Sequence, residues 1–381
     1  MTAFSMSAIG VQELADAADA FAVSLSDVIA GESQLRYQGM PSDGDSRTVY
    51  RALGAEGWIG LHWPLELGGR GLTSLHTLAC EERFGYRWLP LSGYLLSVKT
   101  IGNALLRFAG AELQERLVPE VAAGRLLFCQ GFSEPDAGSD LASLRTGARR
   151  DGDRFVVSGR KIWTSSAEYA DWVYLAVRTD PQRERHRGVS VLVADITTPG
   201  ITVTTHRTLG GGTIGELELD EVEIPAAQLV GELHGGWQVL MGTLDYERVT
   251  SEKVGTVFWL LDSLAPLATD DRSRRALSRL RGAAQAARLQ GRRAAQLLDA
   301  GRPASAQSSM AKLSVAELMQ RLAAFAVDLL GPEGLLEEGS TTLRGRVAAF
   351  QRAAVATTIS GGAAEIQRTV IARRELGLPP R

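Results

Sequence analysis

The sequence is poor in lysine and histidine, and it has few cysteines. Only four of the 41 basic residues are lysine, and we interpret this bias as the mark of a GC-rich genome, without functional weight. The formal net charge of −3 argues against nucleic acid as a partner. The five histidines show no ligand spacing, so we expect no metal site.

Long apolar runs and paired cysteines are also missing. No apolar run approaches the ~20 residues that span a membrane, and no basic residue precedes Arg36. Cys80 and Cys129 lie far apart and form no CxxC pair, so each is predicted to be a small buried apolar residue rather than a nucleophile. We therefore expect a cytoplasmic protein without a membrane anchor or a signal peptide.

What is present is a globular chain of 381 residues whose hydrophobic period changes twice. Residues 1–125 show helical periodicity, as in the segments 11–29 and 96–124. Residues 126–235 contain short β-branched runs bounded by turn residues, which predict a small antiparallel sheet, and residues 236–381 return to long helices. The predicted strands are DRFVVSGRKIWTSS (153–166), DWVYLAVRTD (171–180), GVSVLVADI (188–196), GITVTTH (200–206) and GELELDEVEIP (215–225).

The first chemical signal is FCQGFSEPDAGSD, at the boundary between the first two regions. Pro135 and the glycines Gly131 and Gly138 would explain a tight connection. They do not explain the density of hydroxyls, small residues and free backbone N–H groups. A stretch of this kind can present donors to a polar planar ligand or to a phosphate.

A second signal, GRKIWTSSAEYADW, follows about thirty residues later and places Trp163 beside Thr164, Ser165 and Ser166. A tryptophan in a strand is usually part of the core. Here hydroxyl groups flank it on both strand faces, which favours a stacking platform for a flat cofactor.

Together these segments resemble the acyl-CoA dehydrogenase family, over essentially the whole chain. The implied fold is α+β, with an N-terminal α-helical domain (1–125), a central antiparallel β-barrel-like domain (126–235) and a C-terminal four-helix bundle (236–381). The implied cofactor is FAD, held between the β domain and the bundle. Each motif alone is weak, but these occur in the family's order and spacing: PLELGGRG, SEPDAGSD, GRKIWTSSAEYADW, LDEVEIP, GW before a long helix, and GGAAEIQRTVIARRELGLP.

The resemblance also implies the reaction, α,β-dehydrogenation of an acyl-CoA thioester. A carboxylate would remove the α-proton while the β-hydrogen leaves as hydride to the flavin N5. The α C–H of a thioester is a poor acid, so its carbonyl must be polarised and the base kept dry and close. The positions that the family implies are Gln130, Phe132 and Ser133 at the isoalloxazine edge, Gly138 and Ser139 near the cofactor phosphates or the thioester, Trp163 and Thr164 at the flavin face, Ser165 near N5, and Ser139 and Arg248 on the substrate.

The catalytic base is the main departure from the commonest family pattern. In many members it is a glutamate directly before the glycine of the C-terminal motif, but this chain has Gly361 there. Another branch uses the glutamate of a D-x-E-R sequence on the first long bundle helix, which is Glu247 in LDYERVTSE.

The residues themselves support Glu247, because it interrupts a largely apolar helical stripe. A carboxylate there should be desolvated, with a raised pKa that suits a general base. The alternative is a rotated helix in which Glu247 meets solvent or pairs with Arg248. The stripe is formed by Leu240, Leu244, Glu247, Ser251, Val254, Phe258 and Leu261.

The family's contacts to the adenosine half of FAD in a neighbouring subunit are weak here. The R-x-x-F-G sequence is absent from DDRSRRALSRLRG, and Q-x-x-G-G-x-G appears as DLLGPEG, with Asp328 and Pro332 at two of its positions. An aspartate near a pyrophosphate is repulsive. We therefore expect a second, related subunit in an α2β2 assembly, as in a bacterial subgroup of the family. The alternative is a homo-oligomer in which arginines between Arg272 and Arg281 replace the lost contacts.

Three functional hypotheses stay open at this point. The first is the catalytic subunit of an acyl-CoA dehydrogenase, which would pass electrons to an electron-transfer flavoprotein or a similar acceptor. The second is the same chemistry on an acyl group tethered to a carrier protein. The third is a non-catalytic subunit that completes a partner's site, against which the intact SEPDAGSD, Trp163 and Glu247 argue.

Overall fold

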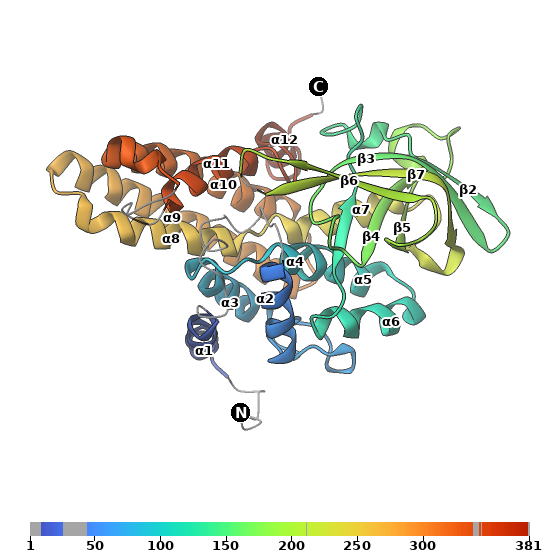
Figure 1. The fold of residues 1–381 in the computed structure, drawn as a ribbon, viewed down its shortest axis with the longest axis horizontal. Coiled ribbons are helices and arrows are strands. Elements are labelled where there is room, and N and C mark those ends of the chain that lie inside the picture. Colours follow the sequence, from blue (N-terminus) through green and yellow to red (C-terminus); the bar gives the residue numbers. More distant parts are fainter. Residues whose placement is uncertain (1–8, 26–43, 211, 338–342, 344, 380–381) are drawn as a thin grey trace.

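The computed structural model describes residues 9–25, 44–210, 212–337, 343 and 345–379, which form three regions (Figure 1). A group of N-terminal helices lies beneath a curled sheet and a long helical bundle. The predicted helix over 11–29 is present as α1, and its last residues fall outside the described ones. The N-terminal elements are α1 (Val11–Ser24), α2 (Gly44–Ala55), η3 (Leu65–Leu67), α3 (Ser74–Tyr86), α4 (Ser92–Tyr94), the π-helix η4 (Leu95–Gly102), α5 (Asn103–Phe108) and α6 (Ala111–Ala122).

The sheet contains all five predicted strands, as β3 to β7, in the order β6-β7-β3-β2-β4-β5-β8 with β1 on β4. Most neighbours are antiparallel, as predicted, but β1 and β2 each pair with β4 in parallel. Strands β1, β2 and β8 were not predicted. The strands are β1 (Phe128–Gly131), β2 (Gly147–Asp151), β3 (Arg154–Thr164), β4 (Trp172–Arg178), β5 (Val189–Asp195), β6 (Ile201–Arg207), β7 (Thr213–Pro225) and β8 (Leu229–Val230). Short 3₁₀ turns lie at Leu141–Ser143, Arg185–Gly188 and Ala226–Gln228.

The C-terminal region is helical, with α8 to α11 around an apolar core and α12 packed against α10 (Figure 1). The continuous helix predicted around Glu247 is wrong, because α7 ends at this residue and α8 begins at Ser251. The bounds are α7 (Gly236–Glu247), α8 (Ser251–Leu264), η8 (Ala265–Leu267), α9 (Asp271–Asp299), α10 (Ser305–Leu330), η9 (Gly331–Leu335), α11 (Arg346–Thr357) and α12 (Ala364–Arg374).

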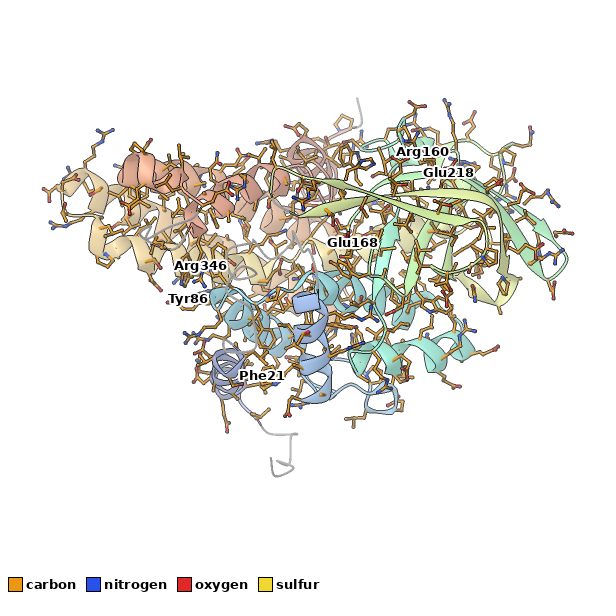
Figure 2. All side chains as sticks on the ribbon, viewed as in Figure 1. Phe21, Tyr86, Arg160, Glu168, Glu218 and Arg346 are labelled. Carbon is orange, nitrogen blue, oxygen red and sulfur yellow. The ribbon has the colours of Figure 1, made fainter. Side chains whose placement is uncertain are left out.

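Helices α3 and α8 join the N-terminal region to the bundle at very close range. A Cβ atom at Gly85 would lie 1.9 Å from the Glu252 carbonyl oxygen, and one at Gly255 would lie 1.9 Å from that of Glu82. Only glycine fits this crossing. Arg346, labelled in Figure 2, adds to the same junction, because its guanidinium lies 5.2 Å from the ring centroid of Trp88, which follows α3, and 4.9 Å from that of Trp259 on α8.

Within the described residues, no helix combines the length and the apolar character needed to cross a membrane.

Candidate active site

The two sequence motifs lie side by side, joined by a buried ion pair. Lys161 Nζ in β3 is 2.7 Å from Glu134 Oε1 and donates to the Phe132 carbonyl at 3.2 Å. The Ile162 N–H donates to the Ser133 carbonyl at 2.9 Å. The SEPDAGSD turn is therefore fixed against the strand that carries Trp163.

Glu134 has a structural role that the sequence analysis missed. Its carboxylate accepts the backbone N–H groups of Arg145, at 2.6 Å, and Thr146, at 2.9 Å, as well as the Lys161 ammonium. Burial opposes its charge, but Lys161 and these donors outweigh burial and lower the pKa of Glu134. The available signal was Lys161, a charged residue at the same strand period as the apolar Phe155 and Val157, which are buried.

Trp163 projects outward because β3 is irregular at this point. The register with β7 shifts between Lys161 and Thr164, and Trp163 has φ = +58°. A bulge of this kind re-aims a side chain, and a positive φ is strained for a bulky residue. The Trp163 side chain is 68% exposed, whereas the adjacent Thr164 is fully buried and its Oγ1 has no hydrogen-bond partner among the described residues.

The other predicted cofactor residues differ in how accessible they are. The Phe132 ring is buried and packs on Tyr174 at a centroid distance of 5.8 Å, so only its backbone could face a ligand. Ser133 and Ser165 are half-buried, whereas Gly138 and Ser139 are exposed. A Cβ atom at Gly138 would meet nothing within 4 Å, so this turn leaves open space.

Glu247 and Gly361, the two alternative base positions of the sequence analysis, meet in space. A Cβ atom added at Gly361 would lie 2.9 Å from Glu247 Oε1. Gly361 has φ = +64°, a conformation that glycine adopts readily. The carboxylate from the end of α7 therefore occupies the place toward which a side chain at position 361 would point.

The Glu247 side chain is half-buried, its Oε2 atom is buried, and its carboxylate forms no ion pair among the described residues. Its Oε2 has no hydrogen-bond partner in the described part of the chain. Burial raises the pKa of Glu247, while Arg248, Lys253 and Lys312 act weakly in the opposite direction, as does a hydrogen bond from Gln130. The predicted alternative partner, Arg248, instead lies 3.8 Å from Asp245.

The four lysines of this chain share an interior location. Lys99, Lys161 and Lys312 are at most 7% exposed, and Lys253 is half-buried, so all four lysines are interior. The genomic interpretation of the lysine bias is not tested by this placement and stays a prediction. Arginine takes the exposed positions, and the compact ammonium is retained where space is limited.

These features fit a flavin with its ring near Trp163. The exposed indole offers a stacking face, the open turn at Gly138 offers backbone donors, and the Thr164 hydroxyl is unpaired. Gln130 joins this side of the site to Glu247. The sheet and the bundle thus contribute to one site, although the roles of the individual residues stay predictions.

Comparison with known proteins gives the same family along the whole chain. The N-terminal, middle and C-terminal domains of acyl-CoA dehydrogenases match residues 8–125, 129–222 and 234–376. Acyl-CoA dehydrogenase FadE26 of Mycobacterium tuberculosis is 33% identical over 354 residues, which cover 87% of this chain and 88% of that protein. Acyl-CoA dehydrogenase IpdE1 of the same organism is 34% identical over 347 residues, or 88% of each chain.

Solved structures agree with this assignment. The ChsE4-ChsE5 complex from Mycobacterium tuberculosis contains a chain with a TM-score of 0.85 and 30% identity, covering 97% of this chain and 98% of that chain. A variant of the Tcur3481-Tcur3483 steroid acyl-CoA dehydrogenase gives 0.89 at 28% identity, covering 97% and 99%. The chain belongs to the acyl-CoA dehydrogenase family, and it is an enzyme of this kind.

Proposed function

We propose that this chain is the catalytic subunit of an FAD-dependent enzyme that introduces an α,β double bond into an acyl-CoA thioester, with Glu247 as the base. Family membership supports the reaction and a flavin cofactor. The observation that carries the choice of base is the 2.9 Å separation between Glu247 Oε1 and a Cβ atom at Gly361.

Glu247 is suited to take the α-proton as a carboxylate. Burial keeps water away, and its unpaired Oε2 needs no ion pair to be broken before it can accept a proton. The raised pKa makes it a stronger base than an exposed glutamate, while the surrounding cations limit the rise. When bound, FAD would accept the β-hydrogen as hydride.

The remaining site residues would bind and orient the two ligands. Trp163 would stack on the flavin, with Ser165 near its reactive edge and Ser133 and Gln130 along its side. Ser139 would contact the thioester end of the substrate. Arg248 is buried, and its Nε has no hydrogen-bond partner among the described residues, which supports a donor role toward the substrate.

The direct test is a spectroscopic titration of the purified, FAD-loaded protein, alone and with any co-purifying subunit. Adding straight-chain and steroid side-chain acyl-CoA thioesters should bleach the oxidised flavin absorbance anaerobically. An otherwise identical thioether analogue, which has no acidified α-proton, should leave the absorbance in place. A folded complex that fails to bind FAD when it is supplied in excess would refute the proposal.

A second subunit is proposed to complete the FAD site. Asp328 and Pro332 are both exposed at the end of α10, where they offer no positive charge for a pyrophosphate. The similar ChsE4-ChsE5 and Tcur3481-Tcur3483 proteins, each named for two components, support a heteromeric assembly. Native mass spectrometry should find fewer FAD molecules than chains, and a fully active homotetramer with one FAD per chain would contradict this.

A further inference from the structure

The Gly361–Gly362 turn is held against Glu247 by two side chains from other parts of the bundle. Lys312 Nζ, on α10, donates to the Gly362 carbonyl at 2.6 Å. Gln367 Nε2, on α12, donates to the same carbonyl at 2.9 Å and to that of Gly361 at 3.2 Å. Both carbonyls of the turn are thus fixed from outside.

The position of this turn determines the space around the base. A Cβ atom at Gly361 would lie 2.9 Å from Glu247 Oε1, so a small displacement of the turn changes the space that the substrate α-carbon must share with the carboxylate. Gly361 and Gly362 both have positive φ values, +64° and +93°. Two consecutive glycines in this region are intrinsically mobile, because few steric limits restrict them. External hydrogen bonds are needed to hold one conformation.

Lys312 also contributes charge to the site. It is 4% exposed, and it faces Glu247 at the end of α7, Arg248 beside it, Lys253 on α8 and Glu365 on α12. An ammonium held at this place favours the ionised form of Glu247.

We propose that Lys312 is a positioning residue of the reaction, which fixes the Gly361–Gly362 turn at the face of Glu247 and supplies part of the positive charge around that carboxylate. This inference rests on Glu247 being the base. A lysine suits the position because its compact ammonium can reach one carbonyl in a closed space. The larger, planar guanidinium of an arginine fits such a space less well.

Four variants separate the two contributions of Lys312. Lys312→Met removes both the donor and the charge, and Lys312→Arg restores both with a different shape. Gln367→Leu removes the other clamp without changing charge. Lys253→Met removes a neighbouring charge, and Lys253 has no hydrogen bond to the turn among the described residues.

The first measurement needs neither substrate nor turnover. Hydrogen–deuterium exchange is followed in the 357–367 segment, where Ser360 N–H donates to Ala356 and Ala364 N–H donates to Thr358. We expect exchange at least ten-fold faster in Lys312→Met and Gln367→Leu, wild-type exchange in Lys253→Met, and partial protection in Lys312→Arg. Wild-type exchange in Lys312→Met would overturn the positioning role.

The second measurement is the pH profile of flavin reduction in a single turnover. Burial lowers the pKa of Lys312 to about 8, so the wild-type rate should fall as the pH rises through this value and the ammonium is lost. Lys312→Met should lack this alkaline limb and reduce its flavin about 100-fold more slowly, as expected for a displaced reacting group. In Lys253→Met the limb should persist, and in Gln367→Leu it should stay at the wild-type pH.

The acidic limb reports the charge at Glu247. Losing a nearby cation makes its carboxylate easier to protonate, so this limb should move to higher pH in Lys312→Met and Lys253→Met and stay unchanged in Gln367→Leu. Unchanged limbs in Lys312→Met would refute the inference.

If Lys312→Met does not fold, Lys312→Arg and Gln367→Leu still decide it through exchange. If Glu247→Gln reduces flavin normally, the proposed base is wrong, whereas the exchange result stands independently.

Discussion

The pair Glu81 and Glu252 and the single carboxylate of Glu247 lie on either side of the α7–α8 junction, and their surroundings differ. Between α3, η4 and α8, Lys99 Nζ is 2.9 Å from Glu81 Oε2 and 2.8 Å from Glu252 Oε2. Burial opposes the charge on Lys99, but the two carboxylates outweigh it and raise its pKa. Ser251 Oγ also donates to Glu81. Each of these two carboxylates is thus matched with an ammonium within 3 Å, although they share the single Lys99 and burial also raises the pKa of Glu81.

Glu247, only four residues before Ser251, has no such match. Its Oε2 is buried without a partner among the described residues, and burial raises its pKa. The comparison distinguishes two uses of a buried carboxylate. One that is paired at short range joins elements of the fold, whereas one that is left unpaired remains able to accept a proton.

Glu247→Gln should have the largest effect, because it removes the unpaired carboxylate that is proposed to accept the proton. The amide keeps the size of the side chain but cannot accept the α-proton. We expect flavin reduction to slow by several orders of magnitude, more than the ~10²–10⁴ typical of general-base catalysis, because the described residues place no second carboxylate against Gly361. Stopped-flow reduction with FAD content measured in parallel tests this.

The matched control is Glu112→Gln, the same change at an exposed glutamate in the first turn of α6. It should reduce its flavin within about two-fold of the wild type, since surface changes away from the reacting atoms have small effects. A Glu247→Gln enzyme that reduces flavin at the control's rate would show that Glu247 is a bystander.

Lys99→Met tests the structural role of the paired carboxylates. It leaves Glu81 and Glu252 buried together without a cation, so we expect a loss of about 3–5 kcal/mol in the free energy of unfolding. Urea denaturation of the assembled protein measures this. Folded, FAD-loaded Lys99→Met should still reduce its flavin within about ten-fold of wild type, and a loss as large as that of Glu247→Gln would place Lys99 in the reaction instead.

The sequence predicted the architecture well because the relevant signals are local. Five strands show β-branched alternation, and the two cysteines are buried as expected. Strand β1 escaped prediction because it is four residues long and its parallel partner β4 lies far along the chain. Strand β2 pairs with the adjacent β3, but it reads GARRD and carries no apolar alternation.

The helix break after Glu247 could not be predicted, since Arg248, Val249 and Thr250 include neither glycine nor proline. Tertiary contacts override helical periodicity there, because all three residues are buried. The candidate base was nevertheless found by motif position. Its convergence with Gly361 and the clamp by Lys312 required coordinates, because they join segments more than 100 residues and about 50 residues apart.

Trp163→Ala should have a smaller effect, on cofactor affinity rather than on proton removal. The exposed indole has few contacts to lose in the protein itself, so stability should change little. Losing an aromatic stacking partner, worth about 0.5–1.5 kcal/mol beyond buried area, should raise the dissociation constant for FAD by up to about ten-fold. Fluorescence titration measures it, and Trp163→Phe, which keeps a ring, should restore most of the affinity. Unchanged FAD affinity in Trp163→Ala would remove the stacking role.

The smallest expected effect comes from moving the base back to the turn. Because a Cβ at position 361 would lie 2.9 Å from Glu247 Oε1, a glutamate there needs the Glu247 side chain removed first. We therefore expect the double variant Glu247→Ala/Gly361→Glu to reduce its flavin about ten-fold faster than Glu247→Ala alone. The gain is limited because a non-glycine residue at φ = +64° costs about 1–2 kcal/mol. Gly361→Gln in the same background is the control, since it carries the same strain without a base. Equal rates for the two double variants would show that positions 247 and 361 do not face the same α-carbon.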